Sequence, residues 1–473
     1  MKTTLGLIVA LLAVSAHAER PQTDGPRQFI PVAVSGTGAR GTYFVSDVRL
    51  LNRTSESVDV TLIYTPSGSD GSADFSVAQV AIEPGHIAHF PDIVRTLFDR
   101  SGSGTIEVHG DVLVFSAIAN QRPSGIYSQS IGIASSSDAI GNGEGKLYLS
   151  PVTGPTEKRT NIGLTETAGG SGKVRIGLLT DFKSVAIAEI EMRPWQHVQI
   201  SVPLSTGIFD YSYVADVAVT EGNARVLAYA SVIDNITGDA MYIAGTTAPA
   251  RRAILPVVGT VSYGSNSWTT AMWYNSVGFQ LNDGTAALTP VTFYPSTTGA
   301  AGAIRAFLYN ASYGNHEMFS VWSVREDITG HVEVEMPTGA LLTTRVCTGY
   351  PGTRGQAVDL VPIEAAIGSG SALDALRVES SATFRTNAGV AETTGTDAIV
   401  RLTLLDAGGS NRGEKLITLG PRQHLQLPVT ALFDGSIANG RIRFEVVGGT
   451  GRIVGYVSVI ANASGDPVMI IAR

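Results

Sequence analysis

The sequence contains one cysteine, Cys347, among 473 residues. A single cysteine excludes any disulfide within the chain. Cys347 ends an apolar run over residues 341–347 that has the composition of a strand. We therefore expect it to be a buried small hydrophobic side chain, with a reactive thiol as the alternative.

Charged residues are also few, at 16% of the chain, and the acidic ones outnumber the basic ones by 41 to 33. The resulting net charge of −8 favours neither nucleic acid nor an anionic membrane surface, so we expect no nucleic-acid partner. Hydrophobic residues make up 44% of the chain, which is enough to bury cores and excludes a disordered protein.

Long apolar runs are missing beyond the start of the chain, where roughly 18 consecutive residues would be needed for a membrane-spanning helix. The start itself has the pattern of a secretory signal: Lys2, an apolar stretch over 5–14, and the small-x-small site Ala16-His17-Ala18. We predict a signal peptide over 1–18 and no membrane span after its cleavage. Export without disulfides favours a bacterial source, with the protein extracellular, on the cell surface or periplasmic.

What the sequence has in abundance is glycine, with 53 residues, and internal repetition. The stretch VLAYASVIDNITGD at 226–239 returns as IVGYVSVIANASGD at 453–466. Each copy is an apolar run, a polar turn with glycine and a second apolar run, which is the signature of a β-hairpin.

Other segments repeat at nearly the same spacing. RTNIGL at 159–164 returns as RTNAGV at 385–390, and PWQHVQI at 194–200 returns as PRQHLQL at 421–427. A unit of roughly 226 residues is thus present twice and fills the whole mature chain. Each unit is itself double, because Pro84 and Pro194 occupy comparable turns roughly 110 residues apart.

A module of about 110 residues has the size of an immunoglobulin-like sandwich. We predict an all-β protein of four tandem immunoglobulin-like β-sandwich domains in an A-B-A-B order. The predicted boundaries are 19–140, 141–250, 251–366 and 367–473. The short junctions between the domains predict a semi-rigid rod.

Strand signals recur every 8–12 residues in the first domain. VDVTLIY at 58–64 alternates between apolar and other positions, as a half-buried strand does. A short helix is expected at 91–100. The expected strands are 29–34, 44–51, 58–64, 75–82, 87–90, 104–109, 112–119 and 127–133.

The RTNxGL segment, the proline turn and the AYASVxDNxTGD hairpin together resemble tandem immunoglobulin-like repeat domains of uncharacterised exported bacterial proteins. The resemblance covers both B domains well and the A domains loosely. It implies a fold and export, and it implies no activity. The second copy departs from the pattern at Val390 and Ala461.

The hairpin turn is the first candidate site. Asp234, Asn235, Thr237 and Asp239 cluster there and offer oxygen ligands to a calcium ion. Turn chemistry explains the same residues, because Asn and Asp bond their own backbone and Gly relaxes the geometry. Since Ala461 replaces Asp234 in the second copy, we favour the turn interpretation and predict no metal site.

Catalytic groups are not recognisable. His197 and His424 share one repeat position, and neither has a nucleophile or carboxylate at a catalytic spacing. GNGEGK at 141–146 lacks the glycine spacing of a phosphate loop and is interpreted as a linker. We predict no catalytic residue and no cofactor.

Aromatic residues are the remaining candidates for ligand binding. Trp195 follows a proline in a turn, and Trp268, Trp273 and Tyr274 lie in the third domain, which also holds Trp322. Exposed aromatic side chains can form a platform for sugar rings or for a partner protein. The alternative is packing, either in a core or across a domain joint.

Two functions remain. The first is a non-enzymatic, exported adhesion, binding or spacer protein whose partner is an unknown protein or glycan. The second is a carbohydrate-binding accessory protein or a hydrolase that uses the aromatic third domain, which would need an exposed aromatic groove and two nearby carboxylates.

Overall fold

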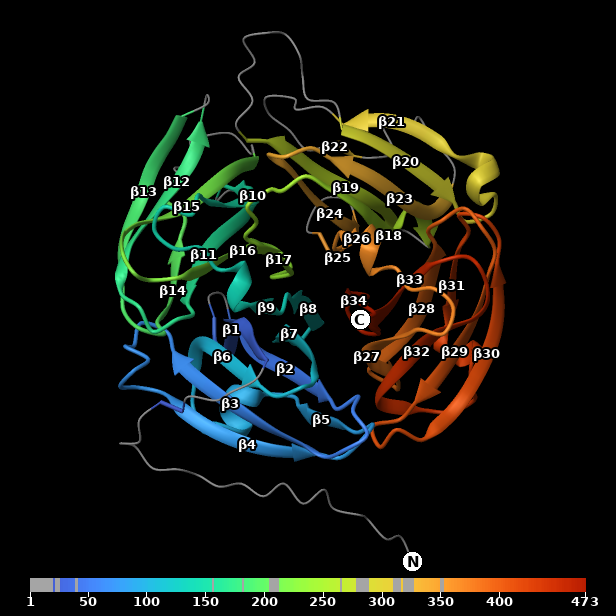
Figure 1. Cartoon of the computed structure of the whole chain (residues 1–473), viewed down its shortest axis with the longest axis horizontal. Helices are drawn as coiled ribbons and strands as arrows, with labels where there is room; N and C mark the ends of the chain where they lie inside the picture. Colours follow the sequence, from blue (N-terminus) through green and yellow to red (C-terminus); the bar gives the residue numbers. More distant parts are fainter. Residues whose placement is uncertain are drawn as a thin grey trace, which may run out of the picture.

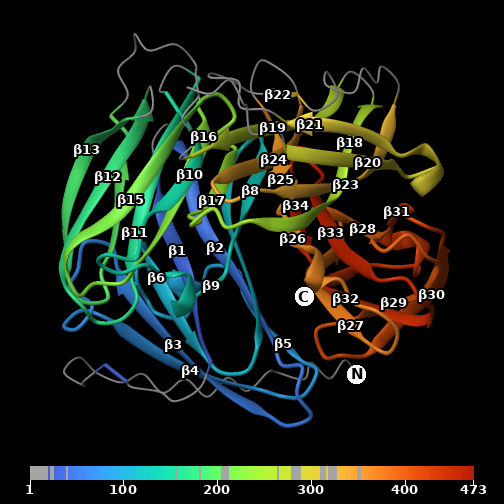
Figure 2. The same ribbon diagram turned by 45° about the horizontal axis from the view of Figure 1, so that its top comes forward.

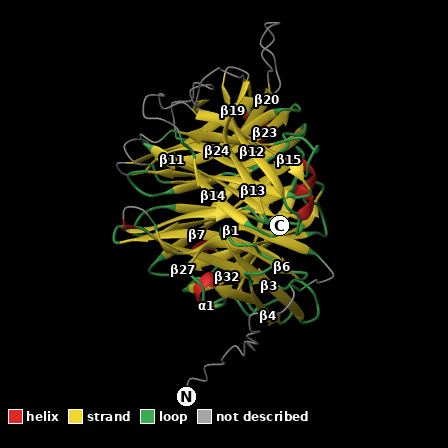
Figure 3. Cartoon of the chain, turned by 90° about the vertical axis from the view of Figure 1, so that its left-hand side faces the viewer, coloured by secondary structure: helices red, strands yellow, loops and turns green. Residues whose placement is uncertain are grey.

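The structure is a computed structural model, and it describes residues 20–21, 26–38, 41–154, 157–180, 183–203, 212–263, 266–277, 289–308, 316–317, 327–348 and 353–473. The described residues are mostly strands joined by turns and a few short helices (Figure 3). The strands form six antiparallel sheets within this part of the chain. The predicted all-β sandwich class is therefore confirmed, whereas the predicted signal peptide lies outside the described residues.

The first nine strands form one sheet, which we call unit A1. Its strand order is β4-β3-β6-β1-β2-β7-β8, with β5 beside β2 and β9 beside β1. The sheet encloses one apolar core, which also buries two side chains of the one-turn helix α1 (Ile93–Thr96). The strands are β1 (Arg27–Thr37), β2 (Tyr43–Leu51), β3 (Val58–Pro66), β4 (Ser76–Ile82), β5 (Ile87–Phe90), β6 (Gly102–His109), β7 (Leu113–Arg122), β8 (Gly125–Ile131) and β9 (Ala134–Ser135).

The next eight strands form two four-stranded sheets, which we call unit B1. The sheet orders are β10-β15-β12-β13 and β14-β11-β16-β17. Both sheets contribute to one core, for example Ile176 from the first and Ile162 from the second. The strands are β10 (Leu147–Thr153), β11 (Lys158–Glu166), β12 (Gly172–Thr180), β13 (Lys183–Met192), β14 (His197–Ser201), β15 (Ser212–Gly222), β16 (Val226–Asp234) and β17 (Ala240–Ala244).

The second half repeats both topologies as units A2 and B2, with each strand number 17 higher than its counterpart. In A2 these are β18 (Arg251–Tyr263), β19 (Asn266–Ser276), β20 (Thr289–Pro295), β21 (Ile304–Leu308), β22 (His316–Glu317), β23 (Ile328–Met336), β24 (Ala340–Thr348), β25 (Gly355–Ala357) and β26 (Val361–Pro362). In B2 they are β27 (Ala372–Ser380), β28 (Phe384–Glu392), β29 (Ala398–Leu405), β30 (Asn411–Leu419), β31 (His424–Pro428), β32 (Ile437–Gly449), β33 (Ile453–Ala461) and β34 (Pro467–Ile471). The predicted duplication thus appears as two copies of one topology.

Local predictions agree well with these elements. The eight strands expected in 29–133 are present as β1 to β8, and the helix expected at 91–100 appears as α1. Both predicted hairpins form, as β16–β17 and β33–β34. Cys347 is buried in β24, as predicted. The immunoglobulin-like identity of the units and their predicted boundaries stay predictions.

The repeated glycine of the RTNxG segment has a packing role. An added Cβ at Gly163 would lie 2.0 Å from the ring of Tyr229, and one at Gly389 would lie 2.0 Å from the ring of Tyr456. Both tyrosines are fully buried. Only glycine leaves room for these rings, which explains why the two segments recur together in each half of the chain.

The four units follow one another around a common centre and form a ring (Figures 1 and 2). Strands β8, β17, β25 and β34 lie toward the middle, and β13 and β30 lie at the rim (Figure 1). Unit B2 returns to unit A1, so the last strands lie beside the first ones. The predicted semi-rigid rod is therefore wrong, because a rod has no contact between its terminal domains.

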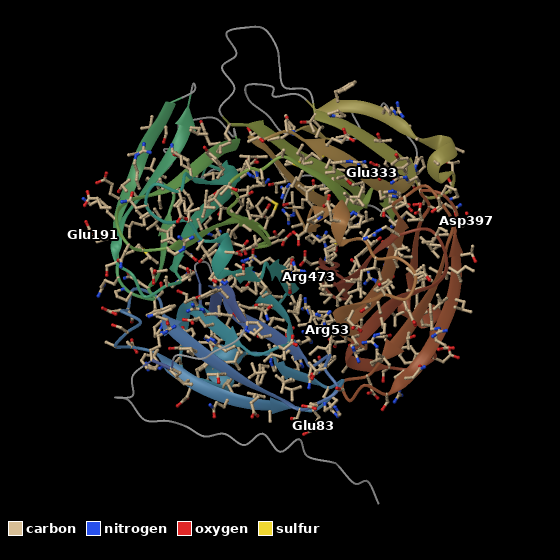
Figure 4. The ribbon with its side chains drawn as sticks, in the orientation of Figure 1. Arg53, Glu83, Glu191, Glu333, Asp397 and Arg473 are labelled. Atoms are coloured by element: carbon tan, nitrogen blue, oxygen red, sulfur yellow. The ribbon has the colours of Figure 1, made fainter. Side chains whose placement is uncertain are left out.

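A shared apolar core closes the ring. Leu51, Ile87 and Phe115 of A1 belong to the same cluster of buried side chains as the core of B2. The Ile87 amide N–H also donates to the Ala407 carbonyl at 2.8 Å. Toward the middle, an Arg53 guanidinium nitrogen donates to the Arg473 carbonyl at 3.0 Å (Figure 4). A1 and B2 are thus joined by both packing and hydrogen bonds.

A buried ion cluster lies in this closing contact. Asp47 of A1 pairs with Arg49 of the same strand at 2.5 Å and with Arg377 of B2 at 3.3 Å. His89 contacts the other carboxylate oxygen at 2.9 Å. Burial alone would raise the pKa of Asp47, but Arg49, His89 and Arg377 outweigh it and hold the pKa well below its ordinary value. Arg49 also donates to Asn439 of B2 at 2.8 Å.

We predict that Asp47→Asn destabilises the protein by about 3–5 kcal/mol, because it leaves two buried guanidinium groups without their carboxylate. Asp74→Asn is the matched control, since the Asp74–Arg100 pair is exposed and such a pair contributes about 0–1 kcal/mol. Urea unfolding at pH 7 measures both. Equal losses in the two variants would contradict a closing role for Asp47.

Candidate functional site at the centre of the ring

The tips of the two repeated hairpins meet at the centre of the ring. Asp239 ends the turn between β16 and β17, and Asp466 ends the turn between β33 and β34. Both side chains are almost completely buried. The Gly355 amide N–H of A2 lies within hydrogen-bond distance of both carboxylates, at 2.9 Å from Asp239 Oδ2 and 3.2 Å from Asp466 Oδ1. The Ser128 N–H of A1 donates to Asp466 Oδ2 at 2.8 Å.

One guanidinium group lies close to this carboxylate pair. Arg345 of β24 is buried and forms an ion pair with Asp239. We call Ser128, Asp239, Arg345, Gly355 and Asp466 the hub. It draws on all four units, because the two hairpin tips come from B1 and B2 and their partners come from A1 and A2.

The hub holds more carboxyl groups than positive charges. Burial raises the pKa of Asp239, and Arg345 opposes the rise. Burial also raises the pKa of Asp466, and the charge on Asp239 raises it further. We infer that Asp239 carries the negative charge opposite Arg345, and that Asp466 is the member of the pair that takes up a proton more readily.

Further hydrogen bonds fasten the tips to the A units. Arg122 of A1 donates to the Ile236 and Thr237 carbonyls at 3.1 and 2.6 Å. Arg354 of A2 donates to the Ser464 carbonyl at 2.6 Å. The repeated hairpin is therefore more than a turn, because its backbone docks onto neighbouring units.

Asp234 acts as a turn residue, which is the interpretation that the sequence favours. Its Oδ1 accepts the N–H groups of Ile236 and Thr237 at 2.9 and 2.8 Å. Its Oδ2 accepts the Thr353 N–H of A2 at 3.0 Å. Asn235, another candidate calcium ligand, accepts from Arg159 at 2.8 Å. In the described part of the chain, no group of three or more His, Cys, Asp or Glu side chains is arranged to hold a metal ion.

A cavity of about 520 Å³ opens beside the hub. Residues of all four units line it, including Ser130 of A1, Tyr148 of B1, Arg251 of A2 and Arg473 of B2. Figure 4 places Arg473 in the middle of the ring. Most of the lining comes from A1, B1 and A2, and B2 contributes Arg473, so the cavity depends on how these units pack together. Its volume lies within the range of roughly 300–1,000 Å³ that small-molecule sites occupy.

The cavity wall is polar as well as apolar. Tyr148, Thr246 and Thr343 contribute hydroxyl groups, and Asp359 contributes a carboxyl group. Burial raises the pKa of Asp359, and the neighbouring Arg473 opposes this rise. The wall can therefore offer hydrogen bonds and positive charge to a bound molecule.

The repeated histidines have structural roles. His197 is fully buried, and its Nε2 lies 2.9 Å from the Tyr229 hydroxyl, which donates to Gln199 at 2.9 Å. His424 and Tyr456 repeat this contact at 2.8 Å. Burial lowers the pKa of each histidine to about 4. Ser296 Oγ lies 2.7 Å from His424 Nδ1, but among the described residues no carboxylate forms an ion pair with either ring.

The structure corrects two of the four aromatic candidates. Trp273 is buried in the core of B1, although it belongs to β19 of A2. Tyr274 is buried in the core of A2, and its hydroxyl lies 2.6 Å from Thr289 Oγ1. Neither side chain can form an exposed platform, so the ligand-binding prediction is wrong for both. The alternation of the strand sends successive side chains into different cores.

The other aromatic candidates differ in their surroundings. Trp268 is half-buried on β19, and Trp322 lies outside the described residues. Trp195 is half-buried at the joint of A1 and B1, where the Arg20 guanidinium lies 4.7 Å from the ring centroid. Arg20 also forms an ion pair with the buried Glu107 of A1. A binding role for Trp195 and Trp268 stays a prediction.

In the second half of the chain, Arg422 alone takes the place of Trp195 and Arg20. Arg422 occupies the position of Trp195 and pairs directly with Glu333, the counterpart of Glu107. Both Trp195 and Arg422 adopt a left-handed backbone, with φ of 56° and 58°. The joint therefore keeps one guanidinium on one buried carboxylate in each half of the chain.

Sequence reasoning missed Arg345, Gly355 and Arg251. One signal for Arg345 is present, because it is the one charged residue inside the apolar run 341–347. A charge in a buried strand needs a partner. Nothing local to Gly355 or Arg251 marks them, since their surroundings are made by residues distant in sequence.

Comparisons with known proteins leave the function open. No family model and no curated protein matches the chain. A solved structure described as "Biofilm associated protein - BSP domain" aligns with 94% of this chain and 96% of its own, at 9% identity and a TM-score of 0.16. That score is too low to relate the two folds. None of the described helices is long and apolar enough to cross a membrane.

We predict an asymmetric response of the two hub carboxylates. Asp239→Asn should destabilise the protein by about 3–5 kcal/mol, because it leaves Arg345 buried without a negative partner. Asp466→Asn should cost less, about 1–3 kcal/mol, because it leaves no cation unpaired but turns an amide NH2 toward one of the two backbone N–H groups that the carboxyl group accepts. Urea unfolding at pH 7 distinguishes them, and equal losses would contradict the assignment of charge.

Because His197 and His424 are buried, we predict that the protein loses stability in acid. Their pKa is lower in the folded protein than the ordinary value near 6.5, so their contribution is present above that pH and is lost as the pH falls toward 4. Each should reduce the unfolding free energy by about 1.4 kcal/mol per pH unit in this window. Asp466 acts in the opposite sense, because a raised carboxyl pKa favours the folded state as the pH falls.

Unfolding curves between pH 7 and 5 test both effects. His424→Asn should remove part of the acid loss, and Asp466→Asn should make the loss steeper. His86→Asn, in a surface turn of A1, is the matched control. If His424→Asn and wild type have parallel pH profiles, the histidine is not the source of the acid loss.

Proposed function

We propose that this chain is an exported, non-enzymatic binding protein of the adhesion or surface type, and that its central cavity is a ligand site. The observation that carries the proposal is a cavity of about 520 Å³ in the middle of the ring, to which A1, B1 and A2 contribute most of the lining and B2 contributes Arg473. Export is proposed from the signal-like start of the sequence.

Ring closure argues for binding over spacing. A spacer gains from end-to-end length, and four units of this size placed in line would be several times longer than one unit. Here the last unit instead packs against the first, with a shared core and a buried ion cluster. The closed ring is therefore shorter than four units in line, and it has an enclosed, rigid interior.

The buried ionisable groups argue for binding over catalysis. Asp47, Asp239 and Glu333 are paired with arginines of a neighbouring unit, and Glu107 is paired with Arg20. A general acid or base needs a free face toward a substrate. These carboxylates contact structural partners, which fits a scaffold better than an active site. A carbohydrate-processing third domain would need an exposed aromatic groove. Trp273 and Tyr274 are buried and cannot line such a groove.

A plug of the cavity tests the proposal. Ala244 is exposed and lines the cavity, so Ala244→Trp should fill the site without disturbing a core. Ala81→Trp places the same side chain on the exposed face of β4 and is the matched control. We expect at least one class in a panel of sugars, amino acids and organic acids to raise the melting temperature of wild type and of Ala81→Trp, with no effect on Ala244→Trp.

Mass spectrometry of the recovered compound completes the test, because a binding protein returns its ligand unchanged. Binding that persists in Ala244→Trp would contradict the cavity as the site. Conversion of the compound by the purified protein would contradict a non-enzymatic function.

A further inference from the structure

We propose that the central cavity takes a small hydroxylated carboxylate, such as a sugar acid, and that Arg251 binds its carboxylate group. This inference rests on the proposed function, in which the cavity is the ligand site. It adds the chemical class of the ligand and the residue that selects it.

Arg251 is a cation without a partner. It begins β18 directly after the junction of B1 and A2, it is half-buried, and it lines the cavity. Its Nε is buried and has no hydrogen-bond partner. Its neighbour Arg252 points elsewhere and pairs with Glu335 at 3.3 Å, where both side chains are more than half exposed. Arg251 is thus the candidate ligand-binding residue, and Arg252 is its matched control.

The buried arginines of the described chain are paired, whereas the half-buried Arg251 is not. Arg345 pairs with Asp239, Arg377 with Asp47, and Arg441 with Asp374. Burial lowers the pKa of Arg251, and no carboxylate offsets the effect. A buried charge is normally compensated, so an uncompensated one in a cavity wall indicates a missing anion.

The carboxyl groups of the cavity are already engaged. Asp138 accepts hydrogen bonds from the Ser135 N–H at 2.7 Å and from the Ser135 hydroxyl at 3.1 Å. Asp359 interacts with Arg473. Neither lies in an ion pair with Arg251, so its guanidinium group is left for a ligand. The chain as a whole carries a net charge of −8, so a free guanidinium is the local feature that could hold an anion.

The rest of the wall suits hydroxyl groups. Tyr148 and Thr246 line the cavity, and Thr344 Oγ1 is buried there without a hydrogen-bond partner. A guanidinium group binds a carboxylate through two parallel hydrogen bonds, and hydroxyls of the wall can bind hydroxyls of the same molecule. A monosaccharide acid combines both groups and is small enough for a cavity of this volume.

Isothermal titration of the mature chain with D-glucuronate and D-glucose tests the inference, because the two probes differ in the carboxylate. We expect glucuronate to bind at least about tenfold more tightly than glucose, as a charge-assisted pair requires. Arg251→Gln should remove this preference by weakening glucuronate binding at least about tenfold. Arg252→Gln should behave as wild type, and Arg251→Lys should retain only part of the preference, because lysine lacks the planar fork.

The outcomes separate this inference from the proposed function. If glucose and glucuronate bind equally and Ala244→Trp blocks both, the cavity is a ligand site and the role of Arg251 is overturned. If inorganic phosphate binds as tightly as glucuronate, the preference for a carboxylate is overturned. If no compound binds wild type, both proposals fail. Circular dichroism melting of Arg251→Gln and Arg251→Lys shows that each variant is folded.

Discussion

A buried carboxylate pair held by one guanidinium group is the interaction on which this ring depends. Asp239 and Asp466 approach the same Gly355 N–H, and Arg345 supplies the positive charge. Isolated charges at such a depth are strongly destabilising, and they become tolerable only when every partner is present. Because the partners belong to four different units, the hydrogen bonds of the hub form together only when all four units meet.

The duplication diverges where strict symmetry would be unfavourable. The pairing of β7 with β8 and of β24 with β25 makes Ala117 of A1 the counterpart of Arg345 of A2. Two arginines at the centre would repel each other. With no arginine at the centre, both carboxyl groups would lack a cation. A single arginine that pairs with one carboxyl group, beside a second carboxyl group whose pKa is raised, reduces this conflict. The joints between A and B units diverge in a similar way. In the second half Arg422 pairs with Glu333, whereas in the first half Trp195 takes the position of Arg422 and Arg20 supplies the guanidinium group.

The same arrangement connects the hub to the proposed ligand site. Closure brings the wall residues of the cavity together, and it also excludes the elongated shape that separate modules would have. Rigidity reduces the ordering that a ligand must impose on its site, which favours affinity. A cation such as Arg251 can remain unpaired in this wall because the surrounding ring is stabilised elsewhere, by shared cores and paired arginines.

Much of the local structure could be predicted from the sequence, because strand alternation and turn residues act between neighbours in the chain. The eight strands of A1, both repeated hairpins and the buried Cys347 follow from such patterns. The repeat period also determined that one topology would occur twice. Only the tertiary structure decided how the units meet, since those contacts join residues such as Arg49 and Asn439 that are 390 positions apart. For this reason the rod prediction failed, Trp273 proved to be core, and the hub and Arg251 emerged only from the closed ring.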